Sequence, residues 1–259
     1  MKARTAIAAM TLLASPLTLI PQISSAQTVV QQAAEHRLQL DFHVNDAALA
    51  KMLPQGWEPM IATQGPAKDC NLRMIFIDQM GIVGGDGKPA AYPTAQLAYL
   101  AIPVKHAASG NTGQIIIHGL TEHAVDAPGA FGVYQHASTA RMSRTVSSSG
   151  GKMIVSENWE FAAPSGEHMM VQVEYERGPV RRGTAEVKFF HPNDPSKFQV
   201  FKTDQAIDIL RNPTTTPPDH VRKFTYKAGG GKIAPLFDGT EKVVSWDVFP
   251  WYIRTVSTP

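Results

Sequence analysis

Segments in which apolar and polar residues alternate constrain the fold of this chain more than any other feature of its sequence. Residues 153–161, 168–177 and 184–191 each place apolar side chains at every second position, with mostly polar ones between them. A period of two is typical of β-strands whose two faces meet different surroundings. The sequence Pro-Ser-Gly-Glu at 164–167 predicts a turn between the first two segments. We therefore predict that the three segments form a β-meander.

Further strands are predicted at residues 37–44, 72–78, 96–104, 114–120 and 243–253. Helices are fewer. Asn45 and Asp46 predict the start of a short helix over residues 47–53. The strongest helix pattern in the mature chain lies at residues 202–210. Another short helix is predicted at residues 132–144. Residues 27–36 are predicted as a short helix or a loose arm. Many strands at short spacing with few helices indicate one mainly β domain, a barrel or a highly curved sheet.

The N-terminus has the pattern of a cleaved secretory signal. Lys2 and Arg4 precede an apolar stretch over residues 5–20, and Ser24-Ser25-Ala26 offers the small residues that signal peptidase recognises. Prolines interrupt the apolar stretch, which is shorter than the ~20 residues that a membrane anchor needs. We expect residues 1–26 to be a signal peptide, residues 27–259 to be a single domain, and the mature protein to be periplasmic or secreted, with no membrane contact.

Charge and cysteine content exclude several partners. Without Lys2 and Arg4 the chain keeps 22 basic residues against 22 acidic ones, so nothing favours nucleic-acid binding. Cys70 is the single cysteine, which rules out an internal disulfide, and we interpret it as a partly buried structural thiol. A small-molecule ligand is the expected partner, and an oligomer is compatible with the sequence.

Common catalytic and cofactor motifs are missing, among them Gly-x-Ser-x-Gly, His-Glu-x-x-His, Cys-x-x-Cys and a phosphate-binding glycine loop. His118, His123 and His136 lie close in sequence but match no zinc-site spacing. We expect no metal and no cofactor. A Ser-His-Asp triad remains an alternative, because such triads are defined by their geometry in the folded protein and not by sequence spacing.

Acid–base or Schiff-base chemistry would need a carboxylate or a lysine in a dry pocket, where burial shifts its pKa. Three polar residues share a predicted strand or strand end with apolar ones: Glu157, Lys188 and Asp78. A surface position or a structural ion pair is the alternative for each of them.

Residues 40–59, Leu-Asp-Phe-His-Val-Asn-Asp-Ala-Ala-Leu-Ala-Lys-Met-Leu-Pro-Gln-Gly-Trp-Glu-Pro, resemble the opening of the acetoacetate decarboxylase-like superfamily. Residues 73–81, 101–104, 114–120 and 125–132 continue the resemblance in the same order, over roughly residues 37–200. The resemblance implies a closed, cone-like antiparallel β-barrel with a central cavity and a few short helices.

In decarboxylating members of this superfamily a lysine in a Pro-Lys-Lys context forms a Schiff base with a β-keto acid. The corresponding residues 138–144 contain no lysine, and arginine cannot form the imine because it stays protonated. Arg141 and Arg144 could instead clamp a carboxylate by paired hydrogen bonds. His43 matches a position that is basic in decarboxylating members.

These residues give a first hypothesis: an exported barrel that binds or transforms a small oxo or carboxylate compound. His43, Arg141 and Arg144 would orient the anion, and His118, His136 and Glu157 are the acid–base candidates. An enzyme of this kind would be a carbon–carbon lyase or an isomerase that works without a Schiff base, unless a displaced lysine such as Lys188 or Lys105 supplies one.

Two alternatives come from other classes of protein. A lipocalin-like carrier would bind an apolar ligand in a cavity lined by aromatic side chains, for which the candidates are Trp159, Phe161, Phe189 and Trp246. A structural or interaction domain would have a filled core and no cavity.

Overall fold

The computed structural model describes residues 27–123, 130–211 and 219–259. The expected signal peptide, part of the segment that resembles the superfamily at 125–132, and the Thr/Pro-rich residues 214–218 lie outside them. None of the helices in the described residues is long and apolar enough to cross a membrane. The strands are β1 (Thr28–His43), β2 (Trp57–Pro59), β3 (Leu72–Gly84), β4 (Ala95–His106), β5 (Thr112–Thr121), β6 (Tyr134–His136), β7 (Thr139–Ser149), β8 (Lys152–Ala162), β9 (His168–Glu176), β10 (Arg181–His191), β11 (Asp194–Arg211), β12 (Val221–Gly229) and β13 (Lys242–Thr258).

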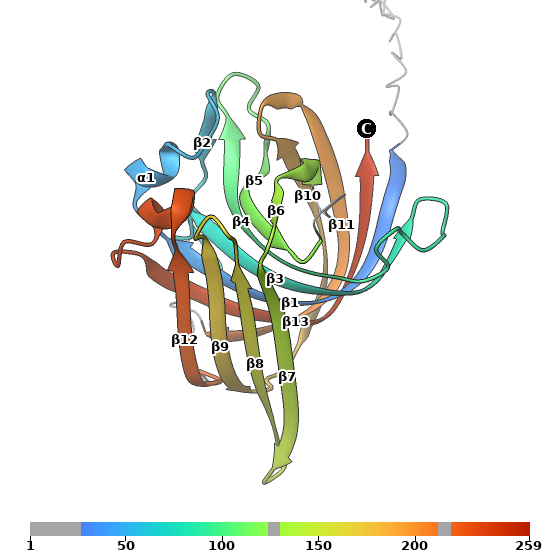
Figure 1. The fold of residues 1–259 in the computed structure, drawn as a ribbon, viewed down its shortest axis with the longest axis vertical. Helices are drawn as coiled ribbons and strands as arrows, with labels where there is room; N and C mark the ends of the chain where they lie inside the picture. Colours follow the sequence, from blue (N-terminus) through green and yellow to red (C-terminus); the bar gives the residue numbers. More distant parts are fainter. Residues whose placement is uncertain (1–26, 124–129, 212–218) are drawn as a thin grey trace, which may run out of the picture.

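Seven of these strands close into a ring, in the order β4-β3-β1-β13-β11-β10-β5 and back to β4. Neighbours in the ring pair antiparallel, except β5 and β10, which pair parallel at Gln114 and Phe189. A ring with an odd number of strands requires at least one parallel pair, and this pair closes the barrel (Figure 1). The expected mainly β, closed barrel is confirmed, with one parallel pair in the ring; β6 adds a second parallel pair where it extends the sheet beside β5.

A second sheet, in the order β12-β9-β8-β7, packs against the outside of the barrel where β1, β3 and β13 run (Figure 1). Apolar side chains from both sheets fill the space between them, and Phe76 lies 5.9 Å from Trp159 between ring centroids. This core includes Leu38, Leu40, Phe42, Met74, Phe76, Val155, Trp159, Phe161, Val171, Tyr175 and Val248. A separate apolar cluster, with Ile75, Tyr99, Ile116, Phe189 and Phe201, lies inside the barrel.

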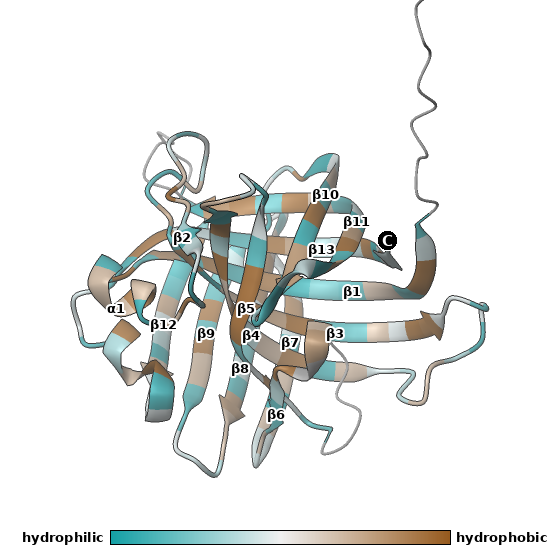
Figure 2. Cartoon of the chain, turned by 90° about the horizontal axis from the view of Figure 1, so that it is seen from above, coloured by the Kyte–Doolittle hydropathy of each residue, from teal (hydrophilic) through white to brown (hydrophobic). Residues whose placement is uncertain are grey.

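Strand β1 is buried on both faces, because one faces the second sheet and the other faces the barrel interior. Its apolar residues Leu38, Leu40 and Phe42 lie between the sheets, whereas the alternate residues Arg37 and Asp41 face inward. Figure 2 shows hydrophilic and hydrophobic segments alternating along β1 and β3. The alternation seen in the sequence therefore separates two buried environments, one of them polar.

The helix predictions had mixed outcomes. The first helix is confirmed as α1 (Asp46–Ala50), where the side chain of Asn45 accepts hydrogen bonds from the backbone N–H groups of Ala47 and Ala48, both at 3.0 Å. Two short 3-10 helices, η1 (Ala130–Gly132) and η2 (Gly231–Leu236), complete the described helical turns.

The helix predicted at 202–210 is wrong, because these residues belong to β11 and are paired on both sides by β10 and β13. Residues 134–136 and 139–149 are strands rather than a helix, and residues 28–36 are the start of β1. Pairing with neighbouring strands overrides a weak local helix preference in all three places. The predicted meander holds for β8 and β9 only, since β10 joins the barrel and β12 takes the place beside β9.

The barrel closure can be tested at Gly113 in β5. A Cβ atom at this position would lie 2.3 Å from the carbonyl oxygen of Lys188 in β10, so the two strands would have to separate. We expect Gly113→Ala to lower the free energy of unfolding by about 1–3 kcal/mol, measured by urea denaturation. Gly81→Ala in β3, where a Cβ meets no atom within 4 Å, is the control and should be neutral. Equal stability of both variants would contradict the closure.

Candidate functional site

The barrel encloses a cavity of about 260 Å³, to which all seven ring strands contribute side chains. This volume lies just below the range of roughly 300–1,000 Å³ that is usual for drug-sized ligands, so the cavity suits a small molecule. Residues Pro66 and Ala67, between β2 and β3, also border it. The polar lining consists of Arg37, Gln39, Asp41, Arg73, Tyr99, Gln114, Thr203, Gln205, Asp247 and Tyr252, and the apolar lining includes Ile75, Phe189, Phe201 and Phe249.

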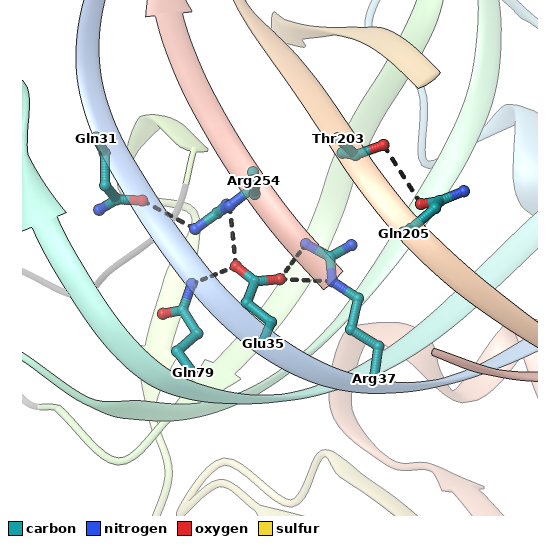
Figure 3. Close-up of polar contacts among 7 residues, drawn as sticks. All are labelled: Gln31, Glu35, Arg37, Gln79, Thr203, Gln205 and Arg254. Carbon is teal, nitrogen blue, oxygen red and sulfur yellow. Dashed lines mark hydrogen bonds and ion pairs between the residues drawn. The ribbon is translucent and has the colours of Figure 1, made fainter. Parts of the chain in front are cut away.

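One end of the barrel interior is occupied by a network around Glu35 (Figure 3). Arg254 Nε lies 2.9 Å and Gln79 Nε2 also 2.9 Å from Glu35 Oε1, while Arg37 Nε donates to Oε2 at 2.6 Å. Burial alone would raise the pKa of Glu35, but Arg254, Arg37 and Gln79 outweigh it and hold the pKa below its ordinary value. Arg37 also lies 3.7 Å over the ring of Tyr252. This network binds β1, β3 and β13 together.

A second polar group lies farther along the cavity wall, around two carboxyl groups. Gln39 Nε2 donates to Asp41 Oδ1 at 3.0 Å, and Arg73 Nε lies 3.6 Å from the same oxygen. Ser245 Oγ donates to Asp247 Oδ1 at 3.2 Å. The guanidinium-bearing side chain of Arg73 keeps 28% of its surface exposed, whereas that of Asp41 keeps 1%. Arg73 is thus only loosely engaged by its carboxylate neighbour.

Burial raises the pKa of Asp247 to about 8, and the neighbouring charge of Asp41 adds to the effect. Burial also raises the pKa of Asp41, although Arg73 and Gln39 counteract it. At neutral pH Asp247 is therefore protonated and uncharged. The described barrel interior then holds three arginines, Arg37, Arg73 and Arg254, against the carboxylate of Glu35 and the carboxyl group of Asp41, whose pKa is raised. The net charge is therefore at least +1, which complements a bound carboxylate.

The six residues predicted from the sequence as site residues do not line this cavity. Arg141 and Arg144 are exposed on β7, and His136 is exposed on β6. His43, at the end of β1, lies with its Nδ1 2.8 Å from the carbonyl oxygen of Asp69. His118 is fully buried on β5, neither ring nitrogen has a hydrogen-bond partner, and burial, together with the charge of Lys232, lowers its pKa to about 4.

Glu157, the sixth predicted residue, is buried between the two sheets. Its carboxylate accepts hydrogen bonds from His36 Nε2 at 3.0 and 3.1 Å, from Trp159 Nε1 at 2.9 Å and from the Tyr175 hydroxyl at 2.9 Å. Burial would raise the pKa of Glu157, but these hydrogen bonds, led by that of His36, hold it below its ordinary value. Because its partners come from β1, β8 and β9, this carboxylate has a structural role, in which it links the two sheets.

The lysines and the cysteine also lie apart from the cavity. Among the described residues that line it there is no lysine; Lys105 is exposed, and Lys188 lies 4.8 Å over the ring of Phe198. Cys70 is buried, and burial raises the pKa of its thiol to about 12, which agrees with the structural interpretation. No three His, Cys, Asp or Glu side chains are grouped as metal ligands in the part of the chain that the structure describes.

Three cavity residues, Arg37, Arg73 and Asp247, are not among the site residues predicted from the sequence. Each has a signal in the sequence: Arg37 begins the alternating strand at 37–44, Arg73 interrupts an apolar run, and Asp247 lies among aromatic residues. A charged residue within an otherwise buried strand needs a partner or a ligand, but the pattern does not say which face meets a cavity.

The fold is that of acetoacetate decarboxylase-like enzymes, as three-dimensional comparison shows. The enduracididine biosynthesis enzyme MppR complexed with pyruvate is similar over 95% of this chain and 96% of its own, at 13% identity and a TM-score of 0.53. An acetoacetate decarboxylase-like enzyme from Sphingomonas wittichii RW1 is similar over 95% of this chain and 99% of its own, at 13% identity and a TM-score of 0.51. No family sequence model and no curated protein matches the chain.

The raised pKa of Asp247 gives a pH-dependent stability. The unfolded chain has an Asp pKa of about 3.9, so the folded state binds this proton more tightly. The resulting stabilisation is complete below about pH 4 and is lost as the pH rises through 8, the folded pKa. We expect the free energy of unfolding to fall by about 2 kcal/mol between pH 6 and pH 8, and Asp247→Asn to remove this decline. Chemical denaturation at several pH values measures it, and parallel curves for both proteins would contradict the assignment.

The structural role of Glu157 predicts a loss of stability on substitution. In Glu157→Gln the amide group replaces one accepting oxygen by a donor, which leaves a buried donor of His36, Trp159 or Tyr175 unpaired. We expect a cost of about 1–3 kcal/mol in thermal or urea unfolding. Glu160→Gln, a partly exposed neighbour on the same strand, should change stability by less than about 0.5 kcal/mol. Equal effects of the two substitutions would contradict the anchoring role.

Proposed function

We propose that this protein binds a small oxo acid, or a closely related carboxylate, in the barrel cavity. The observation that carries the proposal is the small cavity inside the barrel, lined by polar and apolar side chains, whose interior has an excess of at least one positive charge when Asp247 is protonated. A small volume with one uncompensated guanidinium favours a small monoanion. The fold supports the same conclusion, because MppR, which shares it, has been solved complexed with pyruvate.

Arg73 is the proposed carboxylate ligand. Its side chain is partly exposed, its buried Nε has no hydrogen-bond partner and its carboxylate contact with Asp41 is long, at 3.6 Å, so donor groups remain for a bidentate pair with a ligand. Arg37 is already held by Glu35 and Tyr252, and it would contribute positive potential. The aromatic pair Phe189 and Phe201, 4.4 Å apart between centroids, offers an apolar wall for the carbon chain.

Any chemistry in this cavity is proposed to proceed without an imine. A Schiff base requires a lysine within reach of the substrate carbonyl, and the described cavity lining contains none. Lyase or isomerase chemistry that depends on acid–base groups is compatible with the carboxyl groups present.

The apolar-carrier alternative receives less support. Of the four aromatic residues proposed for its cavity, Trp159, Phe161 and Trp246 are buried in the core between the sheets, and only Phe189 lines the barrel cavity. The cavity also carries guanidinium and carboxyl groups, which an apolar ligand would leave without partners.

Arg73→Met tests the binding proposal. Removing a charge-assisted pair costs about 1.5–3 kcal/mol, so we expect the affinity for pyruvate, or for whichever of 2-oxobutyrate and acetoacetate binds best, to fall by about 10- to 100-fold. Isothermal titration calorimetry on the mature protein measures it. The double variant Arg141→Ala/Arg144→Ala removes two exposed guanidinium groups and should leave affinity unchanged. If the double variant lost affinity and Arg73→Met kept it, the binding site would lie on β7 instead.

We also propose that the protein acts after export, starting at Gln27. The support is the signal pattern of residues 1–26, together with β1, which begins at Thr28 and would stay whole after cleavage behind Ala26. The intact mass of protein purified from a periplasmic fraction should match residues 27–259. A mass that includes residues 1–26 would contradict the proposal.

A further inference from the structure

Two carboxyl groups, those of Asp41 and Asp247, lie on the inner wall of the barrel. Asp41 on β1 pairs with Ser245 on β13, and Gln39 pairs with Asp247, so the two aspartates are diagonal neighbours on adjacent strands. Such neighbours are about 7–8 Å apart, a distance that a small ligand can bridge. Both side chains line the cavity and are almost fully buried, at 1% and 7% exposure.

Each aspartate is oriented by a neighbour on its own strand. Gln39 donates to Asp41 Oδ1 and Ser245 donates to Asp247 Oδ1, which leaves the second oxygen of each for other partners. Asp41 Oδ2 is buried and has no hydrogen-bond partner in the structure. This oxygen is therefore free to accept a proton from a ligand in the cavity.

We propose that Asp41 and Asp247 form a proton-transfer pair that catalyses keto–enol exchange of a small oxo acid held in the cavity. This inference rests on the proposed binding function and adds a reaction to it. It needs no lysine, no metal and no oxidant. It assigns Asp41 as the base and Asp247 as the acid.

The surroundings of the pair support these separate roles. Two neighbouring buried carboxyls cannot both ionise at low cost, so one of them retains its proton. Burial raises the pKa of Asp41, but Arg73 from β3, the amide of Gln39 and the thiol of Cys70 counteract it and favour the ionised form. Burial together with Asp41 raises the pKa of Asp247 to about 8, and Asp208 of β11, which lies outside the cavity lining and accepts a hydrogen bond from the Gly178 N–H, adds to this. Of the two carboxyl groups, Asp41 is thus the one whose neighbours favour the ionised form, and Asp247 is the one that retains a proton.

The proposed step conserves atoms and charge. Asp41 removes a proton from the carbon next to the keto group, and the C–H electron pair becomes the C=C bond of the enol. The carbonyl π electrons move to oxygen, which takes the proton of Asp247. Asp41 is then protonated, Asp247 is ionised and the total charge is unchanged. In the reverse direction, after exchange of the Asp41 proton with solvent, the carbon receives a solvent hydron.

Loss of the pyruvate methyl signal in D₂O, followed by proton NMR, measures the exchange directly. We expect the mature protein to accelerate exchange over buffer, and Asp247→Asn and Asp41→Asn to reduce the rate by about 100-fold or more. Asp204→Asn, which removes a carboxyl bound by Arg182 on the outer surface of the barrel, should keep the wild-type rate. The rate should decline as the pH rises through about 8, where Asp247 loses its proton.

Pyruvate binding, measured by calorimetry on the same samples, separates this inference from the binding proposal. Asp247→Asn keeps the shape and neutrality of the protonated residue, so we expect it to fold and to bind pyruvate, and it decides the outcome if Asp41→Asn does not fold. Wild-type protein that binds pyruvate without exchange, or an Asp247→Asn variant with the full rate, would overturn the proton-transfer pair and leave the binding function. No binding of pyruvate, 2-oxobutyrate or acetoacetate would overturn both.

Discussion

Strand β1 is buried on both faces, and the rest of the structure depends on supplying apolar contacts to one face and polar partners to the other. Its apolar face is covered by the second sheet, in contact with residues such as Trp159 and Phe161. Its polar face points into the barrel, where Glu35 would be prohibitively costly to bury without counter-charges. Arg37 and Arg254 supply those charges, and Gln79 from β3 adds a further hydrogen bond. The polar network therefore holds together the same strands that the outer apolar core joins.

The balance of charge inside the barrel connects this architecture to its proposed use. Glu35 is matched by two arginines, whereas Arg73 has only a distant carboxylate in Asp41. A positive excess in a partly enclosed volume of about 260 Å³ favours a small anion over a large or apolar ligand. The parallel closure between β5 and β10 limits the width of that volume, so the topology and the electrostatics select the same class of ligand.

The sequence predicts the β class and the first helix because both depend on local patterns, the alternation in residues 153–161 and the Asn45 cap. It fails at residues 202–210, where pairing partners distant in sequence decide the outcome. It also fails at the site, because a period of two separates the faces of a strand without saying what each face meets. Asp41 and His43 share one face in the pattern, yet Asp41 lines the cavity and His43 lies at the strand end beside Asp69. The curvature and closure of the barrel decide which residues reach the cavity, and they depend on all of its strands together, so the pattern of a single strand does not predict them.

A crystal structure of the mature protein with bound pyruvate would show whether the barrel interior is the ligand site. We expect the ligand inside the barrel, with its carboxylate against Arg73 and its keto group between Asp41 and Asp247. Pyruvate bound on β7 at Arg141 and Arg144, or between the sheets beside Glu157, with an empty barrel would contradict it.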